Sequence, residues 1–214
     1  MTSTSTTSSA TTATLPTLRR LTGAAIGTLC VLLAACSSAP VAPLRYDLGS
    51  APSAVTAACT LPALTLIDVA APGALDNDLM LYRLLYANDQ QIQAYGGHRW
   101  SMPPAQLLTQ RVKAQLVDHG VTLLDAGVAT SNGIQLRVVL NDFSQYFTDP
   151  SHSYGQISIR ATLLRGHSLI AQSSFKQQTP ATSADAPAGA QALRAGSDTV
   201  INELTSWLCK QNLP

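Results

Sequence analysis

The residues of this chain that could carry out catalysis or hold a metal ion are few and widely spaced. Glu203 is the only glutamate, and Asp198 precedes it by five residues, which is not the spacing that pairs two side chains on a helical face. The four histidines are His98, His119, His152 and His167. They show neither the H-x-x-x-H nor the H-E-x-x-H spacing that points to zinc, and the sequence has no G-x-S-x-G nucleophile motif and no phosphate-binding loop. We therefore expect a protein that is not an enzyme and that uses no metal and no cofactor.

A different chemistry, acylation of a thiol, is indicated at Cys36. Residues 1–20 contain no acidic side chain and end in two arginines, and the apolar run 21–35 is too short to cross a hydrocarbon core of about 30 Å. This pattern is typical of a signal peptide, and residues 33–36, Leu-Ala-Ala-Cys, resemble the lipobox of bacterial lipoproteins. We predict a signal peptide over 1–35 and a lipidated Cys36 that carries acyl chains such as palmitate. Ordinary cleavage beside a free cysteine and an organelle transit peptide are the alternatives.

Composition then limits how the mature chain could reach a membrane. The formal net charge is +1 for the whole chain and becomes about −1 without residues 1–35, since loss of Arg19 and Arg20 leaves 11 basic against 12 acidic residues. This near-neutral balance argues against a nucleic-acid partner and gives no polybasic route to anionic lipid. Several acyl chains, at about 0.8 kcal/mol for each buried methylene, give stable attachment where a single chain does not. Residues 36–43 would form a proline-punctuated tether that spans roughly 25 Å.

The remaining cysteines predict a disulfide bond. Cys30 leaves with the signal peptide and Cys36 takes lipid, which leaves Cys59 and Cys209 in an oxidising compartment. A bridge between them would close nearly the whole domain, and two separate buried thiols are the alternative. The chain has no C-x-x-C motif, which argues against thiol exchange chemistry.

Hydrophobic periodicity predicts the elements that would position these groups. The predicted strands are 44–48, 64–72, 79–87, 91–95, 121–125, 134–146, 155–165 and 169–177. A turn at Asn88-Asp89 should join two of them into a hairpin, and the last three should form a meander. The predicted helices are 103–119, with its cap at Ser101 or Met102, and 186–211. This order predicts one α+β domain over residues 44–214, with a mostly antiparallel sheet and two main helices packed on one face.

Aromatic and arginine side chains gather in the middle of the chain, although aromatic residues make up only 5% of it. The cluster consists of Tyr82, Arg83, Tyr95, Arg99, Trp100, Pro103 and Pro104. Tyrosine, tryptophan and arginine are the residue types most enriched among the strongest contacts of protein interfaces. The cluster is therefore predicted either to bind a partner or, for Trp100 in particular, to pack the corner between a strand and a helix.

Four short blocks resemble the ABC-type transport auxiliary lipoproteins, the PqiC-like lipoproteins associated with MCE-domain transport systems. The blocks are R-Y-D-L at 45–48, M-x-Y-R at 80–83, Tyr95, and R-W-x-x-P-P-x-x-L-L at 99–108. His98 and Ser101 depart from the residues that usually flank Arg-Trp in that family. The resemblance covers most of the mature chain, and its specificity lies between residues 80 and 116.

The resemblance implies a non-catalytic docking subunit of an MCE-type ABC transport system that moves lipid across the periplasm and maintains the envelope. It implies an MCE-domain protein as partner, attachment to the periplasmic face of the outer membrane, and a homo-oligomer. Ser37, where an aspartate would retain the protein in the inner membrane of enteric-type bacteria, agrees with outer-membrane sorting. A lipid-binding carrier lipoprotein and an outer-membrane assembly lipoprotein are the alternative functions.

Overall fold

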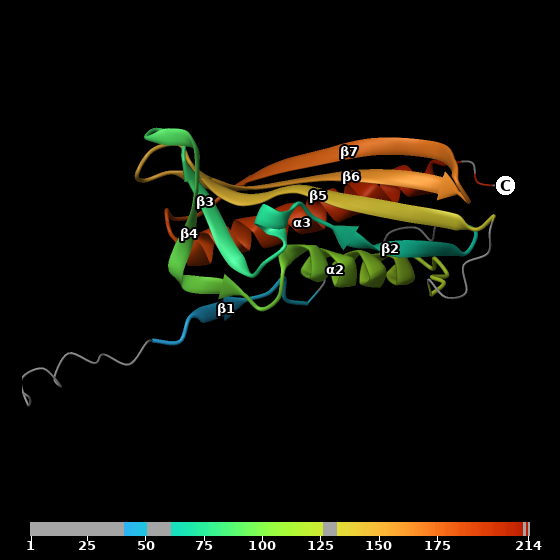
Figure 1. The fold of residues 1–214 in the computed structure, drawn as a ribbon, viewed down its shortest axis with the longest axis horizontal. Helices are drawn as coiled ribbons and strands as arrows, with labels where there is room; N and C mark the ends of the chain where they lie inside the picture. The colour runs from blue at the N-terminus through green and yellow to red at the C-terminus, as the bar shows by residue number, and fades with distance from the viewer. Residues whose placement is uncertain (1–40, 51–60, 126–131, 212, 214) are drawn as a thin grey trace, which may run out of the picture. The chain divides into compact units, whose positions relative to one another are not determined.

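A seven-stranded mixed sheet and two long helices form the described part of the chain (Figure 1). The computed structural model describes residues 41–50, 61–125, 132–211 and 213. The strands are β1 Leu44–Tyr46, β2 Leu64–Ala70, β3 Leu79–Leu84, β4 Asn88–Trp100, β5 Ile134–Phe147, β6 Ser153–Arg165 and β7 Ser168–Pro180. The helices are α2 Pro104–Asp118 and α3 Ala186–Cys209, and a short 3-10 turn, η1, spans Gly73–Leu75.

The strand order is β1-β4-β3-β5-β6-β7, with β2 also paired to β5. The long pairings β5–β6 and β6–β7 and the β3–β4 hairpin are antiparallel, whereas β1–β4, β2–β5 and β3–β5 are short and parallel. Because β5 has 14 residues, β2 pairs with its first half and β3 with its second half. The sheet is therefore mostly antiparallel, and the prediction of an α+β fold is confirmed.

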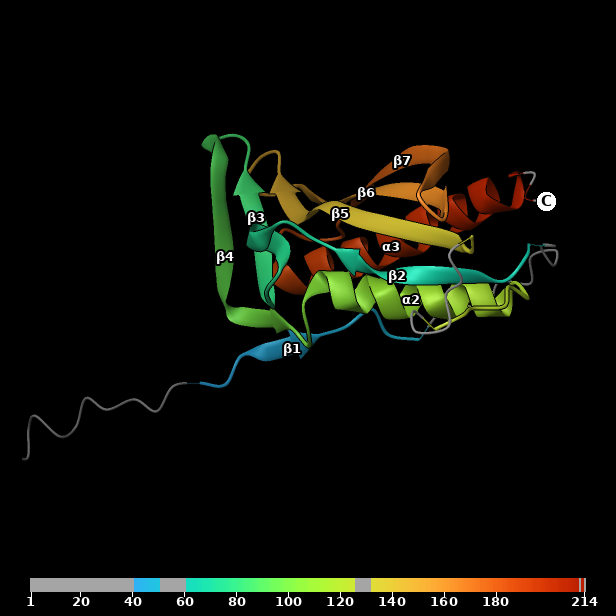
Figure 2. The same ribbon diagram turned by 45° about the vertical axis from the view of Figure 1, so that its right-hand side comes forward.

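Both helices run along the same face of the sheet, as Figures 1 and 2 show from two directions. α3 packs against β5, β6 and β7, while α2 packs against β2 and against α3. Core side chains from sheet and helices fill the layer between them, and the largest of those that are fully buried include Trp100, Phe143, Leu108, Leu136, Ile157 and Leu204. β3 and β4 cross the other strands at a steep angle in Figure 2.

A register shift in β5 decides which side chains face the helices. Leu136, Val138 and Leu140 point to the core before the shift, which lies between Leu140 and Asp142. Because side chains alternate along a strand, one extra residue moves the inward face to the other parity. Phe143 and Gln145 are consequently the inward residues of the second half. The shift thus brings a polar amide under the beginning of α3.

Several predicted elements are confirmed and others are wrong in detail. The two helices, the meander and strand 64–72 are present within a few residues of their predicted bounds. Segment 121–125 is not a full strand, because only Leu123 forms a bridge, to Leu64. The hairpin turns at 85–87, so that Asn88 already belongs to β4. Pro103 occupies the N-cap of α2 and makes no side-chain cap bond, since its ring fixes the backbone instead.

Some predictions fall on residues that the structure does not describe. The signal peptide 1–35, the lipidation site Cys36 and Cys59 all lie outside the described residues. Within the described ranges, neither helix combines the length and the hydropathy needed to cross a bilayer.

Candidate functional site

The predicted cluster comes from the β3–β4 hairpin and from the start of α2. Its seven members are Tyr82, Arg83, Tyr95, Arg99, Trp100, Pro103 and Pro104. The two tyrosines lie on neighbouring strands with ring centroids 4.6 Å apart. The remaining members differ in burial, since Trp100 is enclosed whereas Arg83 and Arg99 are half-buried.

The two tyrosines belong to a row of five rings that crosses four strands. In order, the row is Tyr46 of β1, His98 and Tyr95 of β4, Tyr82 of β3 and Phe147 of β5. Neighbouring centroids are 4.6 to 5.9 Å apart, the range in which aromatic pairs attract each other. The Tyr46 hydroxyl also lies 3.0 Å from His98 Nδ1. We call these five residues the aromatic row.

Hydrogen bonds connect the aromatic row to the beginning of α3. The Tyr95 hydroxyl donates to Gln145 Oε1 at 2.9 Å, and Gln145 Nε2 donates to Ser153 Oγ and to the Asp185 carbonyl. Burial raises the pKa of Tyr95, and the nearby Tyr82 and Asp185 raise it further, so its hydroxyl keeps its proton and remains a donor. Asp185 caps α3 by accepting a bond from the Ala188 amide at 2.8 Å. This network fixes the hairpin against the helix.

Trp100 lies in the core rather than on the surface. Its side chain is 0% exposed and its ring meets Phe143 edge-on at 5.1 Å. Pro103 and Pro104 follow it at the cap and first position of α2. Trp100 therefore packs the corner at which β4 turns into α2.

The two arginines of the cluster have different surroundings. Arg83 Nη1 donates to the carbonyls of Asp89 and Gln90, which ties β3 to the beginning of β4. Arg99 is half-buried, and its Nη1, like the indole nitrogen of Trp100, has no hydrogen-bond partner among the described residues. Neither arginine is a freely exposed contact residue.

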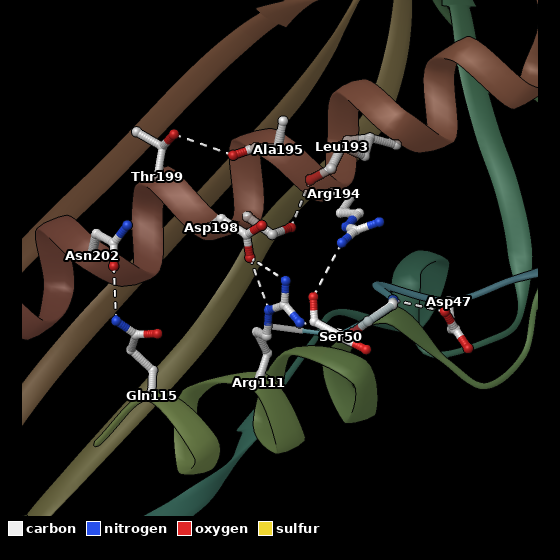
Figure 3. Close-up of polar contacts among 12 residues, drawn as sticks. Asp47, Ser50, Arg111, Gln115, Leu193, Arg194, Ala195, Asp198, Thr199 and Asn202 are labelled. Carbon is white, nitrogen blue, oxygen red and sulfur yellow. Dashed lines mark hydrogen bonds and ion pairs between the residues drawn. The ribbon is translucent and has the colours of Figure 1, made fainter. Parts of the chain in front are cut away.

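Sequence reasoning missed a buried polar seam between the two helices (Figure 3). Arg111 of α2, only 7% exposed, donates to Asp198 Oδ1 of α3 from Nε at 2.8 Å and from Nη2 at 2.6 Å. One turn further, Gln115 donates to Asn202 at 2.9 Å. The side chain of Asp198 is only 20% exposed and is ion-paired. Arg111 and Asp198 are 87 residues apart in the sequence. The one local signal of their ion pair was an arginine within the apolar stripe of a helix.

The same seam holds the chain that follows β1. Arg111 Nη1 donates to the Gly49 carbonyl at 2.8 Å, and Arg194 Nη2 donates to the Ser50 carbonyl at 3.1 Å. β1 itself is fixed to the sheet, because the amide of Ser101 donates to the Tyr46 carbonyl and Arg45 is paired with Asp78 at 3.1 Å. Residues 44–50 are therefore bound to β4 and to both helices. Figure 3 shows Arg194 of α3 beside Ser50.

The histidines lie apart from one another. His98 belongs to the aromatic row, His119 caps the end of α2, His152 pairs with Asp149 at 2.9 Å, and His167 is exposed in the β6–β7 turn. In the described ranges, no three His, Cys, Asp or Glu side chains come together in a group that could hold a metal ion.

Comparison with known proteins identifies the family. The sequence model of the ABC-type transport auxiliary lipoprotein component family matches residues 46–205, which is most of the chain. The chain belongs to this family. The matched range contains every member of the aromatic row and both partners of the Arg111–Asp198 pair. No curated protein sequence matches the chain.

Solved structures share the fold of this auxiliary lipoprotein at low sequence identity. Protein XCC0632 from Xanthomonas campestris superposes with a TM-score of 0.65 at 19% identity, covering 78% of this chain and 94% of that one. Protein CT253 from Chlamydia trachomatis gives 0.50 at 8% identity, covering 71% and 98%. At these identities the likeness concerns the fold alone.

Proposed function

We propose that this auxiliary lipoprotein is a non-catalytic docking subunit of an MCE-type ABC lipid transport system, anchored by Cys36 to the periplasmic face of the outer membrane. The family match over residues 46–205 carries the proposal. Its MCE-domain partner, its outer-membrane location and its lipid cargo are inferred from the resemblance of residues 45–48, 80–83 and 99–108.

The attachment of the chain after the tether supports a positioning role. β1 begins eight residues after Cys36. Because β1 and residues 47–50 are bound to β4, α2 and α3, an anchor at Cys36 would hold the domain within roughly 25 Å of the membrane. A short tether on a firmly bound strand suits a protein that presents surfaces to a partner.

Docking is favoured over lipid carriage by the packing of the interior. A carrier needs an apolar cavity that can enclose much of an acyl chain. Here the layer between sheet and helices is filled by large side chains such as Trp100, Phe143 and Leu204, which are at most 1% exposed. Among the described residues, the space between the sheet and the helices is therefore filled by the protein's own core side chains.

Two purifications test the proposal. The lipoprotein extracted in detergent should co-purify with the MCE-domain protein of the same genome, at a defined stoichiometry. A stoichiometric lipid on the isolated lipoprotein without any MCE-domain protein would instead identify a carrier. Co-purification of several copies of the lipoprotein without any MCE-domain protein would also contradict the docking role.

The anchor is tested separately by substitution of single cysteines. Cys36→Ser should abolish incorporation of labelled palmitate and release the protein from sedimented membranes. Cys30→Ser is the matched control, since that residue would leave with the signal peptide, and should keep both label and membrane retention. A Cys36→Ser protein that still sediments with membranes would refute the lipid anchor.

A further inference from the structure

β1 is the described element nearest to Cys36 in the sequence, and it forms one end of the sheet. It begins at Leu44, so residues 37–43 separate it from the predicted anchor and reach at most roughly 25 Å. Residues 88–97 of β4, roughly 30 Å of strand, separate β1 from the turn of the β3–β4 hairpin. Both views place β1 and this turn at opposite ends of the hairpin (Figures 1 and 2). An anchor at Cys36 therefore brings the β1 end of the sheet to the bilayer first.

The side chains at this end include an exposed apolar residue and two arginines. Leu44 is 60% exposed although its side chain is large and apolar. Arg45 of β1 and Arg99 of β4 are register partners, and paired strands place such partners on the same face of the sheet. The side chain of Arg45 is 54% exposed and is paired with Asp78 at 3.1 Å. An apolar side chain next to guanidinium groups suits the boundary between water and lipid.

The side chain of Arg99 has no partner for its charge among the described residues. It takes part in no hydrogen bond or ion pair there, and its Nη1 is buried without an acceptor. Such a donor is unfavourable, because it has lost water and gained no bond in exchange. Turning the Arg99 side chain outward breaks no bond and exposes its donors. A phosphate group suits them, because its oxygens match the fork of a guanidinium.

The charges at this end do not add up to a basic surface. Asp47 follows β1 and Asp76 precedes β3, both exposed, and Asp78 is paired with Arg45. Zwitterionic phospholipid is therefore a sufficient partner, since a tether makes the contact intramolecular and even a weak one is then populated. A second copy of the chain fits less well, because β1 has three residues and such short edges discourage strand pairing.

We propose that the β1 end of the sheet lies on the phospholipid headgroups of the membrane that holds Cys36. Leu44 enters the outer part of the lipid layer, and Arg45 and Arg99 bind lipid phosphates. The inference rests on the lipid anchor in the proposed function and adds the orientation of the domain. The turn of the β3–β4 hairpin, with Tyr86 49% exposed, then points away from the bilayer.

Photo-crosslinking to lipid tests this orientation. The full-length lipoprotein, extracted in detergent and reconstituted into phosphatidylcholine vesicles, carries p-benzoylphenylalanine in place of Leu44 or, as the control, of Tyr86. After illumination, mass spectrometry should find a phosphatidylcholine adduct at position 44 and none at position 86. Equal adducts at both positions, or no adduct at position 44 in protein that sediments with the vesicles, would overturn the inference and leave the anchor intact. Protein that does not sediment with the vesicles would overturn both.

Substitution of the arginines tests the phosphate contact. Arg99→Gln removes no bond within the described residues, so thermal unfolding should be unchanged. The loss of a charge-assisted hydrogen bond should lower lipid crosslinking from position 44 by up to about tenfold. Arg45→Gln should act in the same direction, whereas Arg137→Gln, at an exposed arginine of β5, is the matched control and should have no effect. Equal crosslinking in all three variants would overturn the inference.

Discussion

At the scale of single residues, burial separates the side chains that stabilise the domain from those that could contact a partner. The sequence drew attention to Trp100 and to the tyrosines by type, and the structure places them in different surroundings. Trp100 is enclosed, whereas Tyr46, Tyr82 and Tyr95 are half-buried in the aromatic row. Residue type predicted aromatic packing, but exposure depends on partners from other strands that a local pattern does not contain.

Trp100→Ala should unfold the domain or weaken it severely. The change removes a fully buried ring from the corner between β4 and α2, which costs about 3 to 5 kcal/mol in a packed core. Urea unfolding followed by circular dichroism measures the loss. Trp207→Ala, at a half-buried ring, should cost clearly less, and equal stability of the two variants would contradict the assignment.

Arg111→Met should destabilise the protein by about 3 kcal/mol, because Asp198 is then left without its partner in a mostly buried site. The double variant Arg111→Met with Asp198→Leu should recover part of the loss, since no unpaired charge remains. Lys113→Met is the control, because its pair with Asp68 is exposed and should contribute under about 1 kcal/mol. A urea titration measures the stability of each variant. This account would be contradicted if the double variant were no more stable than Arg111→Met.

At the scale of elements, long periodic segments were predicted well and parallel pairings were not. The alternation in 134–146 and 155–165 identified the meander, because antiparallel neighbours in sequence are neighbours in space. The positions of β1 and β2 could not be predicted, since their partner strands lie about 54 and 70 residues further along the chain. The short segment 121–125 contains apolar residues, yet it pairs with β2 only through the bridge between Leu123 and Leu64.

Gly189→Ala should destabilise the protein, although alanine usually stabilises a helix relative to glycine by nearly 1 kcal/mol. A Cβ at this position would overlap the side-chain amide of Gln145, which is held by Tyr95 and Ser153. Overpacking of this kind costs roughly 1 to 3 kcal/mol. Gly196→Ala in the same helix, where a Cβ would meet its nearest neighbour at 3.1 Å, should be much closer to neutral in thermal unfolding. A stabilised Gly189→Ala variant would show that α3 can move away from Gln145.

At the scale of the whole molecule, the predicted Cys59–Cys209 bridge would connect the segment after β1 to the end of α3. It remains a prediction, because Cys59 lies outside the described residues. Closing a loop of this length would stabilise the fold by about 5 kcal/mol in the chain-entropy description.

Maleimide labelling tests the bridge. The native protein should react only after reduction, whereas Cys209→Ser should leave Cys59 free to react without it. Prompt labelling of the unreduced native protein at these two positions would exclude the bridge. Measurement by mass spectrometry assigns the label to a residue.

The parallel pairings of β1 with β4 and of β2 with β5 also determine the order in which the fold can be completed. A ribosome makes both strands before their partners, since β1 pairs with residues 98–100 and β2 with residues 134–139. Contacts between such distant segments slow folding. The first strands synthesised must therefore stay unpaired until β4 and β5 exist, while the later meander of neighbouring strands can assemble on its own. We expect β5, β6 and β7 to nucleate folding and the N-terminal strands to dock last.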